Sequence, residues 1–498
     1  MKLYAGLLLA GAAQTLANPA PTTTYGEWLK PLIRSQLMQA LVTTKGLMGN
    51  LAKLQEIADN NGGNRAFGLP GYKASVDYIL SKTKKSKNFK TWTQDFPALF
   101  AQVESISFKV GDTEYKPYGL TYSPSTPEEG LTLPLVLGVF GPEGCTNAAY
   151  DGLDVEGKIV LVQRGSCPDG TTLLGRLKPA AAAGAAAVVI YTDLTTQVTA
   201  GSLSAPSPDL VPGFFINKAD GEALRARIEA GEALEAYAQQ TQIVETRITQ
   251  NVFTETKGGD PNNVIMLGAH LDSVQAGAGI NDDGTGSSLI LEVKEALEKF
   301  KVKNKVRFAW WGAEENGLLG SKYYVQNLKE EEANNILTYL NFDMVGRGYF
   351  GVFDGDGSVH GLAGPAGSDV IEKLFFDDMT RKGINVTAAR FTGGSDYQSF
   401  INIGKPVGGL HTGTGVEQDP CYHQKCDTYS NPDPKTLTIN AKAAAHVLSI
   451  LAMTGHEIIP KSTVNATMLT SRGLIGRDDV LWTVPEPGDR HVTCGNDI

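Results

Sequence analysis

The segment at residues 263–283 constrains this chain most, because it joins an expected buried strand to a group of imidazole and carboxylate side chains. It begins with the apolar run 264–267, which predicts a buried strand. His270 and Asp272 follow where that strand should end, and a glycine-rich loop then leads to Asp282 and the start of a helix. Ligands in open α/β sheets bind at the carboxyl ends of strands. Imidazole and carboxylate groups at such a place predict a metal site.

Strands and helices alternate along the second half of the chain, from residue 247 onward. This alternation predicts an α/β fold with a mostly parallel central sheet that is covered by helices on both faces. The expected strands lie at 264–267, 306–311, 336–342 and 406–410, and the expected helices at 287–300, 318–328, 368–382 and 438–453. The metal site should therefore lie at the carboxyl edge of the sheet.

Further polar groups follow the later strands. Glu314 and Glu315 follow the second strand, Asp343 follows the third, and His423 lies in a loop after the fourth. Taken singly, an Asp after a strand is usually a helix cap, and adjacent glutamates are usually solvated. Buried together, such carboxylates are costly unless a positive group pairs with them, and no Lys or Arg adjoins Glu314 or Asp343. Two histidines and three carboxylates suit a pair of zinc ions.

The length of 498 residues predicts one large domain with an insertion or a second domain. The composition changes near residue 125, where a segment rich in Pro, Ser and Glu precedes short strand-like runs and an alanine-rich helical stretch. We therefore expect a main domain at 31–124 and 247–458, an inserted smaller β-rich domain at 125–246, and a C-terminal tail at 459–498.

The first 17 residues are typical of a signal peptide, because Lys2 precedes an apolar run that is too short to span a bilayer. We expect a leader or pro-segment at 18–30, and no other stretch that could span a membrane. These features predict secretion, with the vacuolar lumen as the alternative destination. The sequons at Asn385 and Asn465 fit glycosylation on that route. The net charge of −10 argues against a nucleic-acid partner.

The chain has five cysteines, which would meet an oxidising compartment on the secretory route. Two pairs lie close in sequence and predict two disulfides: Cys145 with Cys167, and Cys421 with Cys426. Cys494 is then left over near the C-terminus. Because the second pair flanks His423, the alternative is that its thiolates bind zinc.

Five motifs, in order, resemble the motif series of the co-catalytic zinc aminopeptidases: GAHLDSVQAGAGINDDGTG, WWGAEENGLLGS, LNFDMVG, GGSDYQSF and DPCYHQKCD. That family includes secreted bacterial aminopeptidases, secreted fungal leucine aminopeptidases and the vacuolar aminopeptidase Y. The resemblance runs from about Asn64 to Met453 and makes the main domain a zinc peptidase domain. The insert, with GKIVLVQRGSCP and AAAAGAAAVVIYTD, resembles a non-catalytic protease-associated domain.

The resemblance implies a site with two zinc ions per chain. Asp282 would bridge both ions. His270 and Asp343 would complete one metal site, and Glu315 and His423 would complete the other. The family also favours a disulfide over thiolate ligands in the loop that carries His423.

The resemblance also implies roles for residues that do not bind metal. Glu314 would be the general base, Tyr422 would donate a hydrogen bond to the developing oxyanion, and Asp272 would orient His270 through its far ring nitrogen. Two departures affect the substrate pocket. Many relatives have Arg where this chain has Gly394, and the loop at 412–420 is shorter here, so the side-chain preference should differ.

Together these features predict a monomeric zinc aminopeptidase that removes apolar, leucine-like residues from peptides with a free N-terminus. A metallocarboxypeptidase or dipeptidase on the same scaffold would need a cationic pocket for a terminal carboxylate, and no basic cluster adjoins the motifs. A binding module with an inactive zinc site is the non-enzyme alternative. The presence of Glu314 together with all five expected ligands argues against it.

Overall fold

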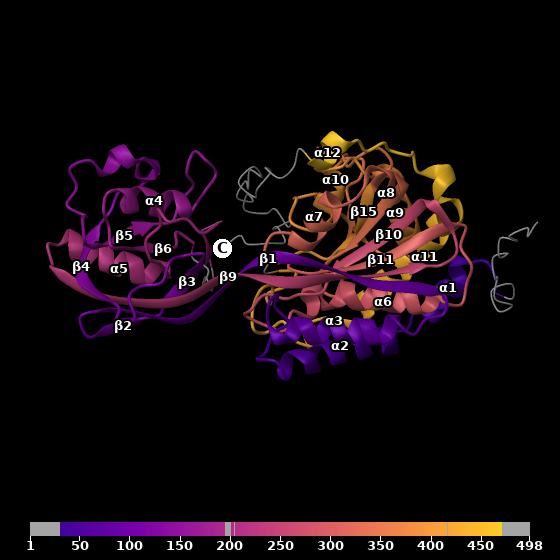
Figure 1. Cartoon of the computed structure of the whole chain (residues 1–498), viewed down its shortest axis with the longest axis horizontal. Helices are drawn as coiled ribbons and strands as arrows, with labels where there is room; N and C mark the ends of the chain where they lie inside the picture. Colours follow the sequence, from indigo (N-terminus) through magenta and orange to yellow (C-terminus); the bar gives the residue numbers. More distant parts are fainter. Residues whose placement is uncertain (1–29, 195–200, 204, 416, 471–498) are drawn as a thin grey trace, which may run out of the picture.

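Two lobes joined by a long two-stranded ribbon make up the computed structural model, which describes residues 30–194, 201–203, 205–415 and 417–470 (Figure 1). The expected signal peptide, nearly all of the expected leader, Cys494 and the tail beyond residue 470 lie outside the described residues. The ribbon consists of β1 (Phe89–Val110) and β9 (Leu234–Thr256), which pair antiparallel along almost their whole length. The larger lobe carries the motifs in which the sequence analysis expects the metal ligands, and the smaller lobe is the insert (Figure 1).

The central sheet of the larger lobe is mostly parallel, which confirms the predicted fold class. β10 pairs in parallel with β11 and β12, and β12 pairs in parallel with β15. Antiparallel contacts occur where β9 joins β11 and where β13 joins β15. The strand order is β14 (Val386–Ala389), β13 (Phe350–Phe353), β15 (Val407–His411), β12 (Ile336–Phe342), β10 (Asp260–His270), β11 (Asn304–Trp311) and β9.

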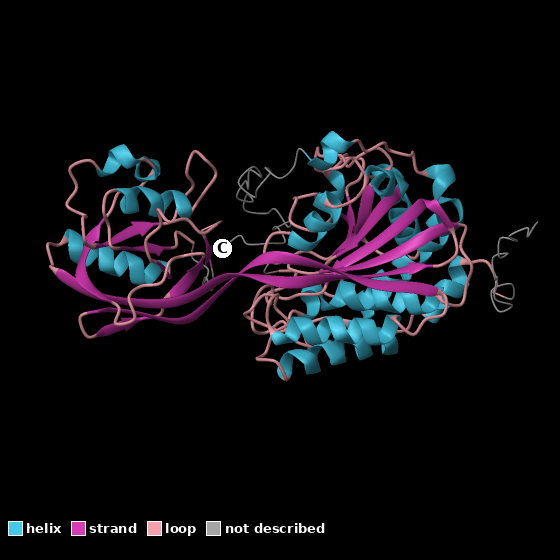
Figure 2. Ribbon diagram, viewed as in Figure 1, coloured by secondary structure: helices cyan, strands magenta, loops and turns pink. Residues whose placement is uncertain are grey.

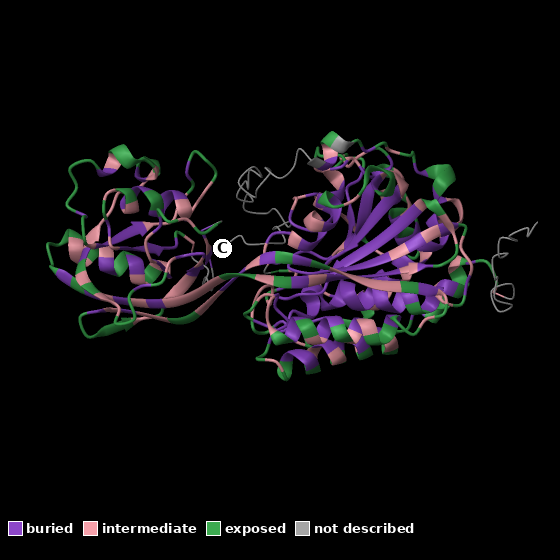
Figure 3. Cartoon of the chain, in the orientation of Figure 1, coloured by how far each residue is buried: buried purple, intermediate pink, exposed green. Residues whose placement is uncertain are grey.

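Helices cover both faces of this sheet, because the central strands are apolar on both sides (Figures 2 and 3). Along β10, Ile265 and Leu267 point to one apolar core, and Val264 and Met266 point to the other. The first core is covered by α1 (Ser35–Leu41), α2 (Thr44–Asp59), α3 (Pro70–Thr83), α6 (Thr285–Leu297), α9 (Ser368–Arg381) and α11 (Pro434–Ile458). The second is covered by α7 (Leu319–Gln326), α8 (Glu330–Asn335), α10 (Tyr397–Ile401) and α12 (Ala466–Thr470).

Helix α11 is longer than the predicted 438–453 and is more apolar than expected. Its start is fixed by Asp433, whose side chain accepts hydrogen bonds from the main-chain amides of Lys435 and Thr436, and Pro434 suits the first helical position. Among the described helices, α11 alone has the length and mean hydropathy (1.3) that could cross a membrane, contrary to the sequence-based expectation. Because 61% of that apolar window is buried inside the fold, α11 has the character of a core helix.

The smaller lobe has its own sheet, which continues from the far half of the ribbon. β4 pairs antiparallel with β9. From β4 the sheet continues through β5, β6 and β8, each parallel to the strand before it, and β3 then pairs antiparallel with β8. The elements are β2 (Thr113–Tyr115), β3 (Tyr118–Thr121), β4 (Leu131–Leu137), η1 (Pro142–Cys145), η2 (Asn147–Tyr150), β5 (Ile159–Gln163), α4 (Leu174–Ala182), β6 (Ala187–Tyr191), β7 (Gly201–Ser202), β8 (Gly213–Ile216) and α5 (Lys218–Glu229).

The core of the smaller lobe includes residues that precede the predicted boundary at 125. Phe108 and Val110 of β1 pack against one face of its sheet, and Leu120 of β3 packs against the other. The division at 125 and 246 therefore stays a proposal, and the core of the insert includes side chains from the far end of β1. The predicted disulfide between Cys145 and Cys167 is present, with 5.7 Å between the two Cα atoms.

Lys405 is a fully buried cation of the larger lobe, and its Nζ donates to the carbonyl of Ser462 at 3.3 Å. Burial, with a smaller effect from Lys461, lowers the pKa of Lys405 from 10.5 to about 8. The unfolded chain therefore binds this proton more tightly, so the cost of the buried charge is fully present below pH 8 and is lost as the pH rises toward 10.5.

We expect Lys405→Met to raise the free energy of unfolding at pH 7, by at most about 3 kcal/mol, and the gain to shrink between pH 8 and 10.5. Denaturant unfolding of both proteins at pH 7 and pH 10 measures this. Lys53→Met, at an exposed position, should change stability by less than about 0.5 kcal/mol at either pH. A pH-independent difference between Lys405→Met and the wild type would contradict the assignment.

Candidate metal centre

All five predicted metal ligands meet at the carboxyl edge of the central sheet. His270 is the last residue of β10, Glu315 lies in the turn after β11, and Asp343 directly follows β12. Asp282 lies in the short turn η3 (Ile280–Gly284) that precedes α6, and His423 lies in the loop between β15 and α11. Parallel strands that end at one edge explain why residues far apart in sequence come together here.

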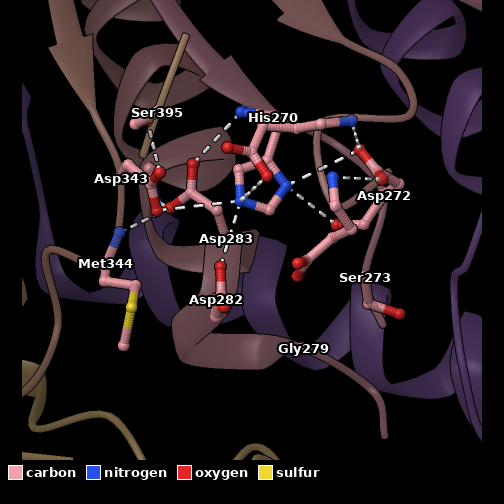
Figure 4. Close-up of polar contacts among 12 residues, drawn as sticks. His270, Asp272, Ser273, Gly279, Asp282, Asp283, Asp343, Met344 and Ser395 are labelled. Carbon is pink, nitrogen blue, oxygen red and sulfur yellow. Dashed lines mark hydrogen bonds and ion pairs between the residues drawn. The ribbon is translucent and has the colours of Figure 1, made fainter. Parts of the chain in front are cut away.

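The Asp282 carboxylate lies between two imidazoles. Its Oδ1 is 3.0 Å from Nε2 of His270, and its Oδ2 is 3.2 Å from Nε2 of His423. Asp343 Oδ1 lies 3.7 Å from the His270 nitrogen, and Glu315 Oε2 lies 3.0 Å from the His423 nitrogen. The five side chains thus form two triads that share Asp282. Figure 4 shows one triad, in which the carboxylates of Asp282 and Asp343 lie beside the imidazole of His270.

The site concentrates negative charge in a buried place. Glu314 and Asp343 are each 2% exposed, and Oε1 of Glu314 and Oδ1 of Asp343 have no hydrogen-bond partner among the described residues. Burial raises the pKa of Glu314 well above its usual range, and Asp396 and Asp343 raise it further, although His270 opposes them. Oxygen and nitrogen donors with unused lone pairs, crowded in a buried site where carboxylates are in excess, fit divalent metal ions.

The histidines respond to the same charges. Burial lowers the pKa of His423, but the carboxylates of Glu315 and Asp282 outweigh burial and raise this pKa to about 10. The pKa of Asp282 is correspondingly lowered, because the hydrogen bonds and charges of the two histidines outweigh its burial. Imidazole and carboxylate therefore pair strongly here, and a metal ion would have to replace the protons that the histidines hold.

Asp272 lies beside His270 as predicted, and it also accepts hydrogen bonds from the turn that carries Glu314 and Glu315. Its Oδ1 is 3.6 Å from Nδ1 of His270, whose nearer contact is the Asp272 carbonyl at 3.1 Å. The Asp272 carboxylate accepts hydrogen bonds from the main-chain amides of Glu314 at 3.1 Å and Glu315 at 3.3 Å. One buried carboxylate thus fixes the end of β10 relative to the two glutamates.

Asp283 is a buried site residue that the sequence analysis missed. Its carboxylate accepts hydrogen bonds from the main-chain amides of His270 at 3.2 Å, Met344 at 3.1 Å and Gly286 at 2.8 Å. It therefore joins the ends of β10 and β12 to the start of α6 (Figure 4). The available signal was the second aspartate of the INDDG sequence, which resembles an ordinary helix cap.

Ser395 and Asp427 were also missed as supports of the ligands. Ser395 donates from Oγ to Oδ2 of Asp343 at 2.6 Å (Figure 4). Asp427 accepts from the main-chain amides of Asn281 at 2.8 Å and Asp282 at 3.0 Å, and so ties the shared ligand to the loop that carries His423. Both residues lie within the motifs GGSDYQSF and DPCYHQKCD, but only the fold shows which ligand each one contacts.

The loop that carries His423 is held by the predicted disulfide. Cys421 and Cys426 are bonded, with 5.3 Å between their Cα atoms, which excludes their thiolates as metal ligands. The Tyr422 ring stacks on the His423 ring, with 3.8 Å between the centroids and 26° between the planes. His423 itself has a left-handed backbone (φ 55°), a conformation that a non-glycine residue keeps only where its surroundings enforce it.

Known proteins are similar to this chain in sequence and in domain content. Residues 251–448 match the model of peptidase family M28, and residues 131–224 match that of the PA domain. Leucine aminopeptidase 2 of Trichophyton rubrum is 37% identical over 481 residues, which cover 92% of this chain and 94% of that protein. A probable leucine aminopeptidase 2 of Aspergillus fumigatus is 37% identical over 458 residues, which cover 88% and 89%.

Two solved structures extend the similarity to the fold. An aminopeptidase from Aneurinibacillus sp. strain AM-1 superposes with a TM-score of 0.71 at 26% identity, over 87% of this chain and 99% of that one. BSAP, a zinc aminopeptidase from Bacillus subtilis, superposes with a TM-score of 0.67 at 25% identity, over 85% and 99%. The fold and the site thus define a metallo-aminopeptidase with a PA domain. The chain belongs to peptidase family M28.

We expect the double variant Cys421→Ser with Cys426→Ser to lower kcat/KM at least tenfold, because supports of metal ligands typically contribute about 10–100-fold. The matched control replaces Cys145 and Cys167, which lie in the smaller lobe and should leave kcat/KM unchanged. Chain-entropy arithmetic gives the control the larger loss of stability, about 3 kcal/mol against roughly 2 kcal/mol, because its loop spans 22 residues rather than 5. Unchanged kcat/KM in the first variant would contradict this role.

Proposed function

We propose that this chain is a zinc-dependent aminopeptidase that removes apolar, leucine-like residues from the N-termini of peptides. The observation that carries the proposal is the pair of triads that share Asp282, with the free carboxylate oxygen of Glu314 beside them. Relatives named leucine aminopeptidase support the substrate class, and a structural neighbour titled a zinc aminopeptidase supports the metal.

Two zinc ions are the proposed cofactors. His270 and Asp343 would hold one ion, Glu315 and His423 would hold the other, and Asp282 would contribute one oxygen to each. When bound, such ions would supply Lewis acidity, which would make a water molecule more acidic and polarise the scissile carbonyl.

Glu314 is the proposed general base. Its side chain is buried, its Oε1 has no hydrogen-bond partner among the described residues, and its main-chain amide donates to Asp272. It takes a proton from the attacking water and later delivers it to the leaving amine, so one group serves both steps. Tyr422, stacked on His423, is the proposed donor to the oxyanion that develops on the scissile carbonyl.

Selection for a free N-terminus follows from the charge of the site. Carboxylates crowded beside the metals disfavour a substrate carboxylate and favour an ammonium group. We assign recognition of the amine to Glu314 and to Asp343, whose Oδ1 has no hydrogen-bond partner among the described residues. Binding the amine would also fix the scissile carbonyl over the metals, which is a gain in orientation.

We propose that the enzyme acts as a secreted monomer, with the vacuolar lumen as the alternative destination. The two disulfides fit an oxidising compartment. The sequon residues Asn385 and Asn465 are both exposed, so either could carry a glycan without a change of fold.

The role of Glu314 predicts that Glu314→Gln keeps its metal and loses its turnover. Metal analysis should find two zinc ions per folded chain in both the variant and the wild type. kcat should fall roughly 10³–10⁴-fold, the upper part of the range for acid–base catalysis. Glu315→Gln is the matched comparison one residue away, and it should lose zinc. A Glu314→Gln enzyme with near-normal kcat would exclude Glu314 as the base.

Recognition of the amine predicts a difference between leucine p-nitroanilide and its N-acetylated form. The acetylated substrate should be cut at least a hundredfold more slowly at equal concentration, which corresponds to about 2.7 kcal/mol of transition-state stabilisation. Chelator should abolish cleavage of the free amine, and zinc should restore it. Equal rates for both substrates would mean that the amine is not recognised, and the aminopeptidase proposal would then fail.

A further inference from the structure

Arg65 is a fully buried arginine that the mechanism does not use. It lies in the turn between α2 and α3, and its hydrogen bonds run to the segment at 271–279. Its Nε donates to the carbonyl of Ala278 at 2.9 Å, its Nη2 donates to the carbonyl of Gly279 at 2.5 Å, and its Nη1 donates to the carbonyl of Leu271. All three nitrogens of the guanidinium therefore donate hydrogen bonds to the same loop.

The main chain of Arg65 holds the same loop. Its amide donates to Oγ of Ser273 at 2.9 Å, and the amide of Ser273 donates back to the Arg65 carbonyl at 3.4 Å. Ser273 Oγ donates in turn to the carbonyl of Gly277 at 3.0 Å. The turn before α3 and the loop at 271–279 are thus joined at several points along the loop.

The loop at 271–279, which Arg65 contacts, connects two of the proposed metal ligands. The loop begins directly after His270 and ends just before η3, so its shape sets the distance between His270 and Asp282. Its last residue, Gly279, has a left-handed backbone (φ 59°), and a Cβ there would lie 2.3 Å from the Asp282 carbonyl and 3.3 Å from Nη2 of Arg65. The packing around Gly279 therefore leaves no room for a side chain at this point.

A cation buried against neutral carbonyls is costly unless negative charge lies nearby. The charges that act on the Arg65 guanidinium are, in order of effect, those of Asp272, Asp427, Asp283 and Asp282. Each of these four aspartates is a proposed ligand or contacts the main chain of the metal centre. Arg65 is therefore electrostatically part of that centre, although it makes its hydrogen bonds to the loop.

We propose that Arg65 is a positioning residue for zinc: its planar fork holds the loop at 271–279 so that His270 and Asp282 are set at the metal-binding separation before metal arrives. The inference rests on the zinc site proposed above. A positive charge alone would repel a zinc ion, so positioning and charge predict opposite effects when Arg65 is replaced. A lysine in its place keeps the charge but loses the fork.

The test is zinc affinity, measured on the full chain by competition with a chromophoric chelator. Arg65→Lys and Arg65→Met should both bind zinc at least tenfold more weakly than the wild type. Hydrogen exchange of the metal-free proteins should show faster exchange across 271–284 in both variants. Arg176→Met is the matched control, because Arg176 is also buried and donates to the loop carbonyls of Gly165 and Gly141, but in the smaller lobe. It should leave zinc affinity unchanged.

The outcomes separate the alternatives. Wild-type affinity in Arg65→Lys with tighter binding in Arg65→Met would show that only the charge matters, and would overturn the proposal. Unchanged affinity in both variants would overturn it as well. If Arg65→Met does not fold, Arg65→Lys decides by the same criterion. A wild-type chain that binds no zinc would overturn the proposed function together with this inference, whereas zinc-binding variants with wild-type affinity would overturn the inference alone.

Discussion

The contact of one carboxylate with two imidazoles is the interaction on which the rest of the site depends. Asp282 reaches His270 with one oxygen and His423 with the other, and the two histidines come from opposite ends of the catalytic half of the sequence. Where three such groups lie together in a buried place, the neighbouring main-chain amides also need hydrogen-bond acceptors. Asp283 and Asp427 accept hydrogen bonds from those amides. Much of the buried negative charge therefore stabilises the main chain around the proposed ligands.

The parts of this structure that could be predicted from sequence are those governed by local pattern. The strand predicted at 336–342 is found with the same bounds, because a mostly apolar run followed by Asp343 leaves little choice of where a strand ends. The convergence of His270, Glu315 and Asp343 followed from the strand ends, since parallel strands share an edge, whereas the ligand roles came from the family resemblance and stay a prediction. The pairing of the cysteines followed from their spacing, and the family resemblance favoured a disulfide over thiolate ligands for Cys421 and Cys426.

The parts that could not be predicted depend on contacts between distant segments. Arg65 lies in an ordinary glycine-rich turn, and its three acceptors are main-chain carbonyls, which leave no mark in the sequence. Composition placed the insert at residue 125, whereas the apolar side chains of Phe108 and Val110 already pack in its core. The hydropathy of α11 reflects a helix buried within the fold, an environment that composition alone does not separate from a lipid one.

The ribbon that joins the two lobes has a consequence for how the chain is built during synthesis. Phe89 at the start of β1 pairs with Thr256 at the end of β9, and everything between them, the insert included, must leave the ribosome before that pair can form. Until then β1 has an unpaired edge that β9 later covers. The insert, with two apolar clusters of its own, can collapse in the meantime and bring both strands together at one end. Pairing of the ribbon can then extend from the insert toward the catalytic sheet, which shortens the loop that each later pair has to close.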